Sequence, residues 1–302
     1  MFLNIILSLL LIHSVNNVYS VENTEFLSLA ENQSVVSTPA RINPENIGVE
    51  ITANKYLVVD VASGKVLAGR HANEEQPIAS ITKIMTALVI LDLNPDWQKQ
   101  VTLMSSDETV GAYPHIYRGE QVKFIDLWKS ALISSDNNSI MALVRALGLS
   151  NLEFTELMNY KAEELGLYNT DFSDPTGLSA GNVSTASDIA RLIYLALQKN
   201  QIRETVIQPK YEIDILNKKN NRQITSTDIL IDSFLNSQIY GYELIGGKTG
   251  YLPEAGYCLA VEITHENKPV IFVVLNSNTI DSRFQDTKVL ADWVFNNYQW
   301  EK

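Results

Sequence analysis

Cysteine, histidine and basic residues are all scarce in this sequence, and each scarcity argues against a class of protein. The 302 residues include one cysteine, Cys258, so no disulfide can form within the chain. The four histidines form no metal-binding cluster, and no metal site is predicted. His265-Glu266 begins a zinc-protease motif, but Pro269 stands where its second histidine is required. Lysine and arginine number 23 against 35 acidic residues, and the net charge of −12 argues against nucleic-acid binding.

Apolar residues, in contrast, are plentiful. They make up 45% of the chain, while charged residues make up 19%, which is enough for a large packed core and excludes extensive disorder. At ~100–200 residues per domain, the length fits one large domain or two smaller ones. Cys258 lies in the apolar run 257–261 and is expected to be a core residue rather than a nucleophile.

The N-terminal region has the pattern of an export signal. Residues 5–12 are apolar except for Ser8, and Val18-Tyr19-Ser20 offers small or modest residues at the positions that a signal peptidase reads. We therefore expect a signal peptide over residues 1–20 and an exported protein. The segment before the apolar run has no lysine or arginine, so an uncleaved N-terminal anchor is the alternative. The run is nevertheless shorter than a membrane span of ~20 residues.

The rest of the chain is predicted to form a linker and one globular domain. The polar, acidic stretch 21–45 has no sustained periodicity and is predicted as a linker, followed by a globular domain over residues 46–300. No additional C-terminal β domain and no C-terminal anchor are expected after that domain.

Hydrophobic periodicity in residues 46–300 predicts strands at both ends and helices in the middle. Residues 55–61 and 66–69, joined by the turn 63–65, predict a hairpin. A helix over about 80–91 is apolar on nearly all sides and is expected to be buried. Further helices are predicted over 124–133, 138–147, 151–165, 184–197 and 283–296, and strands over 242–245, 257–264 and 269–276. The predicted fold class is α+β, an antiparallel sheet flanked by helices with an inserted helical subdomain.

The first chemical motif is Ser80-Ile-Thr-Lys83, an S-x-x-K at the start of the apolar helix. Residues three apart share a helix face, so the Ser80 hydroxyl and the Lys83 amine can meet. The free N–H groups of a helix start also favour a developing oxyanion. A helix cap followed by a solvated lysine is the structural alternative, but an otherwise apolar helix is a poor place for a solvated lysine.

Two further motifs follow in order. Ser135-Asp136-Asn137 lies between two predicted helices, where a loop can direct a hydroxyl and an amide at one site; ordinary cap and turn chemistry is the alternative. Lys248-Thr249-Gly250 can bind a carboxylate and let a peptide lie against the backbone, and a glycine-rich turn with a surface lysine is its alternative. Together the three motifs form the S-x-x-K, S-x-N and K-T-G set of penicillin-binding proteins and class A β-lactamases.

One further match is rejected on its context. Residues 177–181 read Gly-Leu-Ser-Ala-Gly, the G-x-S-x-G pattern of the hydrolase nucleophile elbow. That elbow requires a strand before the motif and a helix directly after it. The preceding Asp174-Pro175-Thr176 is turn sequence, so an elbow is not expected here.

The chain resembles the low-molecular-mass penicillin-binding proteins of the D-alanyl-D-alanine carboxypeptidase type, serine peptidases of family S11. The resemblance extends over about residues 46–300, and its long motifs are 56–65, 77–88, 135–137, 174–178, 246–251, 253–260 and 283–293. It implies a β-lactamase and transpeptidase-like fold and a bacterial cell-wall enzyme on the periplasmic or extracytoplasmic side. The implied partners are peptidoglycan stem peptides, with β-lactams as covalent inhibitors, and no metal or organic cofactor is implied.

The resemblance also implies catalytic roles for individual residues. Ser80 would be the acylated nucleophile and Lys83 the general base, while Ser135 would relay a proton towards the leaving group. Lys248 would maintain the electrostatics around Ser135, and the N–H groups of Ser80 and Tyr251 would form the oxyanion hole. A lysine base requires a pKa well below ~10.4, and burial together with mutual repulsion between the two lysines would lower both values.

The remaining implied roles concern substrate binding. Asn137 would hold the substrate amide, Thr249 would bind the terminal carboxylate, and Gly250 would allow close approach of the substrate. Arg283 matches an arginine near the carboxylate end of the family's site. Asp136 stands where many relatives have glycine, and the sequence assigns it no role.

The sequence leaves three other activities open beside the leading prediction, a D,D-carboxypeptidase. A D,D-endopeptidase that cleaves cross-links would use the same scaffold. A class A β-lactamase needs an E-x-x-L-N motif, which Glu153 and Glu156 do not fit. A non-catalytic penicillin-binding module is opposed by the complete set of motif residues. The oligomeric state and the third residue of the stem peptide are not predicted.

Overall fold

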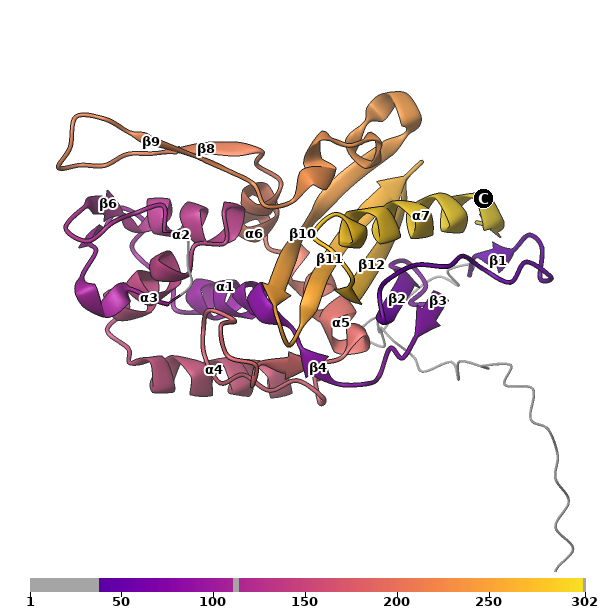
Figure 1. Ribbon diagram of the computed structural model, residues 1–302, viewed down its shortest axis with the longest axis horizontal. Coiled ribbons are helices and arrows are strands. Elements are labelled where there is room, and N and C mark those ends of the chain that lie inside the picture. The colour runs from indigo at the N-terminus through magenta and orange to yellow at the C-terminus, as the bar shows by residue number, and fades with distance from the viewer. Residues whose placement is uncertain (1–37, 111–113, 301–302) are drawn as a thin grey trace, which may run out of the picture.

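The computed structural model describes residues 38–110 and 114–300 and is built around one central sheet (Figure 1). The sheet has five antiparallel strands in the order β10-β11-β12-β2-β3. Its strands are β2 (Lys55–Asp60), β3 (Val66–Arg70), β10 (Tyr242–Leu252), β11 (Gly256–His265) and β12 (Lys268–Ser277). β10 and β3 are therefore the two edges of the sheet, and β10 leaves one row of backbone groups free of strand pairing.

The sheet separates two hydrophobic cores, because successive residues of a strand point to opposite faces. In β11, Cys258 and Ala260 belong to the core shared with α1 (Thr82–Asp92) and α5 (Ala186–Leu197). Leu259 and Val261 belong to the other core, which α7 (Ser282–Asn297) covers. Cys258 is fully buried, as the sequence predicts.

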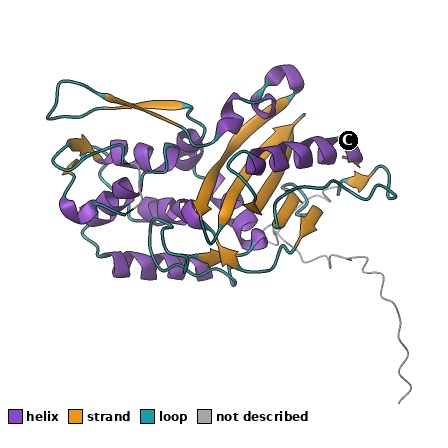
Figure 2. Cartoon of the chain, in the orientation of Figure 1, coloured by secondary structure: helices purple, strands orange, loops and turns teal. Residues whose placement is uncertain are grey.

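The helical part lies beside the β10 edge, where the purple helices of Figure 2 gather on one side of the strands. It consists of α1 with α2 (Phe124–Ile133), α3 (Asn137–Ala146), α4 (Asn151–Glu164) and α6 (Asn200–Val206). Residues Thr82 to Ile90 of α1 are all buried, which confirms the expectation for an all-apolar helix. The α+β fold with an inserted helical region is confirmed.

Short elements complete the described chain. The small strands are β1 (Ala40–Arg41), β4 (Gln76–Pro77), β5 (Gln100–Thr102), β6 (Gln121–Lys123), β7 (Val183–Ser184), β8 (Lys210–Ile213), β9 (Arg222–Thr225) and β13 (Tyr298–Gln299). The 3₁₀ turns are η1 (Ala79–Ile81), η2 (Ser105–Asp107), η3 (Ile229–Asp232), η4 (Phe234–Asn236) and η5 (Gln238–Tyr240). β8 and β9 form a hairpin that extends away from the sheet over α2 (Figure 1).

The structure differs from the predicted elements in several places. Ser80 lies in the 3₁₀ turn η1, and the α-helix begins two residues later at Thr82. β10 continues from Tyr242 to Leu252 and so contains the K-T-G motif. Residues 40–41, within the predicted linker, form β1 and pair with β13. Helix α6 and the β8–β9 hairpin were not predicted at all.

The signal peptide predicted over residues 1–20 lies outside the described residues. Among the helices of residues 38–110 and 114–300, none combines the length and the apolar character that crossing a bilayer requires.

Candidate active site

Three separate segments bring the predicted motif residues together at the β10 edge of the sheet. Ser80 belongs to η1, Ser135 and Asn137 to the junction of α2 and α3, and Lys248 to β10. Lys83 Nζ lies 2.9 Å from Ser80 Oγ and 2.5 Å from Asn137 Oδ1. The three motifs therefore meet in space. Their alternative interpretations as helix caps and turns do not require them to meet.

Lys83 is the most completely enclosed of these groups. Its side chain is fully buried, and Nζ contacts three acceptors: Ser80 Oγ, Asn137 Oδ1 and, at 2.7 Å, the carbonyl oxygen of Thr176. Burial lowers the pKa of Lys83 to about 7, against an opposing effect of the nearby Asp174 and Asp136 carboxylates. When the amine is neutral, its two N–H bonds can satisfy the two carbonyl oxygens, and its lone pair then points at the Ser80 hydroxyl.

Ser135 and Lys248 form the second pair of the site. Lys248 Nζ donates to Ser135 Oγ at 3.0 Å and to its neighbour Thr249's carbonyl oxygen at 3.2 Å. Burial, followed by the charges of Lys83 and Arg283, holds the pKa of Lys248 well below its usual value. The sequence predicted that the two lysines would lower each other's pKa; the repulsion acts on Lys248, whereas for Lys83 the lowering comes from burial.

Asp136, to which the sequence assigned no role, organises the loop between Ser135 and Asn137. It is buried and caps α3, accepting from the backbone N–H groups of Asn138 and Ser139. Its other oxygen accepts from Ser130 Oγ at 3.0 Å and from the His115 N–H at 2.9 Å. The carboxylate thus replaces the conformational freedom of a glycine with fixed hydrogen bonds.

The backbone beside the nucleophile adopts a strained conformation that two glycines make possible. Ala79 has φ +49°, and Ser135 has φ +63°, both in the left-handed region. A Cβ on Gly177 would lie 2.2 Å from the Ala79 carbonyl oxygen, and one on Gly250 would lie 2.8 Å from the Ile78 carbonyl oxygen. The two segments that contain Gly177 and Gly250 therefore approach η1 more closely than a residue with a Cβ would allow.

The expected binding residues lie along β10 and next to it. Thr249 is buried and shares a 2.7 Å hydrogen bond with Thr227 Oγ1. Arg283 is also buried, and its Nη1 donates to the Gly250 carbonyl oxygen at 3.0 Å. Tyr251 is half exposed at the end of the motif, and its ring stacks on that of Tyr257 with centroids 4.3 Å apart.

Sequence reasoning missed two contributors to the site. The Thr176 carbonyl oxygen contacts Lys83, and a backbone group leaves no signal in the side-chain pattern. Asp174 fixes that turn by accepting from the N–H groups of Thr176, Gly177 and Ser179. The motif 174–178, one of those that carry the family resemblance, is the signal in the sequence for this turn.

The described residues form neither a nucleophile elbow nor the glutamate site of a class A β-lactamase. Ser179 lies in a loop bend without a strand before it and contacts Ser173 Oγ, so residues 177–181 do not form a nucleophile elbow. Glu153 is exposed and completes a capping box with Ser150 at the start of α4. Glu156 is exposed on the same helix.

The arrangement as a whole suits acyl transfer to a serine. The Ser80 hydroxyl is hydrogen-bonded to a buried amine, and the Ser135 hydroxyl is hydrogen-bonded to a second buried amine. The edge strand beside them can pair with an extended peptide. Gly250 has no Cβ, which allows such a peptide to approach the backbone of the edge strand.

Comparisons with known proteins give the same family for nearly the whole described chain. The profile of the D-alanyl-D-alanine carboxypeptidase family, peptidase S11, matches residues 38–279. The D-alanyl-D-alanine endopeptidase of Pseudomonas aeruginosa is 33% identical over 90% of this chain and 86% of its own length. The D-alanyl-D-alanine carboxypeptidase DacF of Bacillus subtilis is 31% identical over 82% of this chain and 63% of its own length.

Solved structures agree with these relatives. Penicillin-binding protein D2 of Listeria monocytogenes, in its ampicillin-bound form, is 28% identical. It superposes with a TM-score of 0.70 over 82% of this chain and 99% of its own.

Proposed function

The chain belongs to the D-alanyl-D-alanine carboxypeptidase family, peptidase S11, and from this premise we propose that it removes the terminal D-alanine from peptidoglycan stem pentapeptides. It is a serine-type peptidase and binds penicillin covalently. The observation that carries the proposal is the 2.9 Å contact between Ser80 Oγ and Lys83 Nζ, because Lys83 is buried and has a pKa of about 7. An amine with this pKa is a competent base at neutral pH.

The acylation step begins with attack of Ser80 Oγ on the carbonyl carbon of the penultimate D-alanine. Lys83 accepts the hydroxyl proton, and the new oxyanion lies against the N–H groups of Ser80 and Tyr251. A Cβ on Gly250 would lie 3.3 Å from the Ser80 nitrogen, so β10 runs directly beside that N–H. Collapse of the tetrahedral intermediate breaks the amide bond and leaves an ester on Ser80.

The departing D-alanine needs a proton on its amine. Ser135 supplies it and is reprotonated by the proton that Lys83 took from Ser80, so that Lys83 becomes a free base again. Lys248, hydrogen-bonded to Ser135 at 3.0 Å, maintains the electrostatics around that hydroxyl. Water then attacks the ester, Lys83 again serves as the base, and the shortened stem peptide leaves with Ser80 restored.

Substrate recognition relies on the carboxylate of the leaving residue. Thr249 and Arg283 lie at the end of the site where that carboxylate would bind, and Asn137 holds the amide of the acyl part. The peptide itself pairs as an extended strand with the free edge of β10, and Gly250 allows it to approach the backbone closely.

A D,D-endopeptidase activity on cross-links is the second candidate. It is favoured by the Pseudomonas aeruginosa relative, which is named an endopeptidase and is matched over 86% of its length. In a cross-link, D-alanine can acylate the amine at the D-centre of a diamino acid. That centre also carries an α-carboxylate beside the scissile amide, as a terminal D-alanine does. The two activities therefore share this machinery and differ in the side chain that the leaving residue carries.

The cellular setting follows from the family and the N-terminal pattern. The protein acts on the cell wall, and we place it outside the cytoplasmic membrane after export by residues 1–20, with residues 46–300 as the catalytic domain. An uncleaved N-terminal segment would tether it to the membrane.

Mass spectrometry of purified muropeptides tests the proposal. A pentapeptide monomer and a cross-linked dimer are incubated with residues 21–302 and with the Ser80→Ala variant. Loss of one D-alanine from the monomer by the wild type alone is the expected result. Cleavage of the dimer without trimming would assign the protein to the endopeptidases. If neither substrate changes while Ser80 still forms a penicillin adduct, a penicillin-binding module without turnover replaces the proposal.

A further inference from the structure

The β8–β9 hairpin is attached to the helical part by a buried carboxylate. Glu120 is 0% exposed and accepts two hydrogen bonds from Arg222, at 2.6 and 2.8 Å, and one from Lys218 at 2.7 Å. The Tyr117 N–H adds a fourth at 2.8 Å. Burial alone raises the pKa of Glu120, but the hydrogen bonds from Arg222 and Lys218 outweigh it and hold the pKa at about 2. The pair is therefore ionised at any physiological pH.

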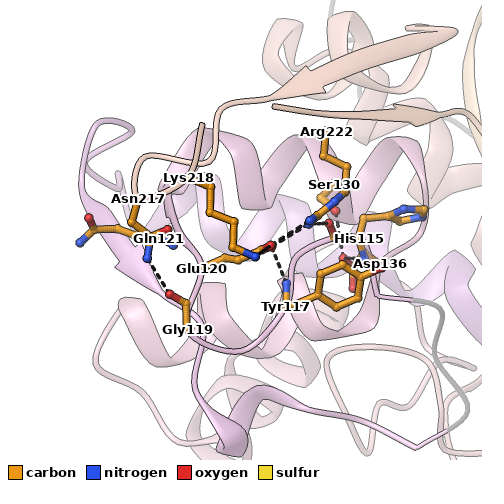
Figure 3. A network of polar contacts seen from close by, with 10 residues as sticks. All are labelled: His115, Tyr117, Gly119, Glu120, Gln121, Ser130, Asp136, Asn217, Lys218 and Arg222. Atoms are coloured by element: carbon orange, nitrogen blue, oxygen red, sulfur yellow. Dashed lines mark hydrogen bonds and ion pairs between the residues drawn. The ribbon is translucent and has the colours of Figure 1, made fainter. Parts of the chain in front are cut away.

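Arg222 also connects this ion pair to the active-site loop (Figure 3). Its Nη1 donates to the His115 carbonyl oxygen at 2.5 Å, and the His115 N–H donates to Asp136 Oδ2 at 2.9 Å. Asp136 stands between Ser135 and Asn137 in the chain and caps the helix that begins at Asn137. A continuous series of hydrogen bonds thus runs from the hairpin to the two side chains that contact Lys248 and Lys83.

The segment that follows β9 also contacts the site. Past the end of β9, the Thr227 N–H donates to the Ile133 carbonyl oxygen at 3.1 Å, just before the Ser135 loop. The Thr227 hydroxyl meets Thr249 of the K-T-G motif at 2.7 Å. Arg222 and Thr227 therefore connect one segment to both the second and the third motif.

We propose that Arg222 and Glu120 are positioning residues for catalysis, which hold His115 and Asp136 so that Ser135 and Asn137 keep their places against Lys248 and Lys83. The inference deepens the proposed function and rests on it for the identity of the substrate. Neither residue contacts the reacting atoms. Loosening the pair slows acylation of Ser80 because Asn137 and Ser135 are then held less firmly in their productive positions.

A chemically matched pair elsewhere in the chain provides the control. Arg145 makes two 2.8 Å hydrogen bonds to the buried Asp107 and one to the Thr102 carbonyl oxygen, the same pattern as Arg222 with Glu120 and His115. The exposed fractions of the two arginine side chains, 27% and 32%, are also similar. Arg145 lies in the last turn of α3, at the end away from the active site.

The experiment measures acylation of Ser80 by a fluorescent penicillin in the full chain, over a range of penicillin concentrations. Arg222→Ala is expected to lower the limiting acylation rate about tenfold, with Arg222→Lys in between, while the penicillin concentration for half-maximal rate changes less than threefold. Arg145→Ala is expected to change the limiting rate less than twofold. Thermal melting of all variants shows how much stability each loses.

Two results would overturn the inference. One is an Arg222→Ala protein that acylates at the wild-type rate. The other is equal slowing in Arg222→Ala and Arg145→Ala at equal loss of thermal stability, which would make the pair a purely structural one. Failure of the proposed function looks different: the wild type would acylate normally but release no D-alanine, and the comparison of the arginine variants would still be made on acylation.

Discussion

At the scale of single residues, the protonation of Lys83 decides the pH range in which the site can react. The free base accepts the Ser80 proton, and the pKa of about 7 gives roughly equal amounts of base and ammonium at neutral pH. We predict that kcat/KM for acylation falls about tenfold per pH unit below pH 7 and levels off above about pH 8. A stopped-flow or gel-based pH profile of penicillin acylation measures it, with thermal melting at each pH as the control. A profile that is flat down to pH 5.5 would contradict the assignment of Lys83 as the base.

Gly177 is the residue whose replacement is expected to disturb the nucleophile most directly. Its φ is +86°, and an added methyl group would lie 2.2 Å from the Ala79 carbonyl oxygen and 2.9 Å from the Ser80 nitrogen. Gly177→Ala should therefore displace Ser80 and lower the acylation rate on the order of 10²-fold. Gly148→Ala separates this clash from backbone strain, because Gly148 has φ +82° and open space around it. Equal acylation rates in the two variants would refute the prediction.

Prediction from sequence identified side chains that the structure places together, and their catalytic roles stay predictions. Ser80, Lys83 and Asn137 are identified by their types and spacing, and the structure brings them together. The Thr176 carbonyl oxygen could not be identified in this way, because every residue has a carbonyl group and only the fold directs this one at Lys83. The role of Asp136 was hidden for a similar reason, since its partner His115 is distant in sequence.

At the scale of elements, the buried strand β11 carries a carboxylate that its surroundings do not accommodate. Glu262 is 7% exposed, its Oε2 has no hydrogen-bond partner among the described residues, and burial raises its pKa to about 7. The folded state thus holds its proton more tightly than the unfolded state does. Below about pH 4.5 the residue is neutral in both states and costs nothing. As the pH rises from 4.5 to 7, ionisation in the unfolded state increasingly favours unfolding, and above pH 7 the loss in the free energy of unfolding approaches about 3 kcal/mol.

The corresponding test is Glu262→Gln, which keeps the shape of the side chain and removes the titration. Urea unfolding should show the variant to be up to about 3 kcal/mol more stable than the wild type at pH 8, with a difference near zero at pH 4. Far-ultraviolet circular dichroism at both pH values serves as the control for folding. A stability difference that does not depend on pH would contradict the prediction.

Prediction of elements followed the strength of their local pattern. The helices over 124–133 and 151–165 were placed within a residue of α2 and α4, because their apolar spacing and caps are encoded locally. The β8–β9 hairpin was missed, because its strands are short and it is held by contacts distant in sequence, such as Tyr211 with Asp126 and Arg222 with Glu120. Helix α6 has seven residues and few apolar ones, too little for a periodic signal.

At the scale of the whole molecule, the strand order places the active site and the contacts of β13 at opposite edges of the sheet. The site lies along β10, and β3 is the opposite edge, with three strands between them. At that far edge β13 brings the C-terminal segment back, and Tyr298 packs on Trp293 and donates from its hydroxyl to the Leu67 carbonyl oxygen. Stability supplied at this edge should therefore be independent of catalysis.

Two substitutions of Tyr298 test that separation. Tyr298→Phe removes the hydrogen bond and should lower the free energy of unfolding by about 1 kcal/mol, whereas Tyr298→Ala also removes a buried ring and should lower it by about 3 kcal/mol. Both variants should acylate at the wild-type rate at 25 °C, since β11, β12 and β2 separate the β3 edge from the β10 edge. Urea unfolding and penicillin acylation measure the two quantities on the same samples. Acylation that falls in step with stability would mean that the far edge of the sheet and the active site are coupled, and would refute the prediction that they are independent.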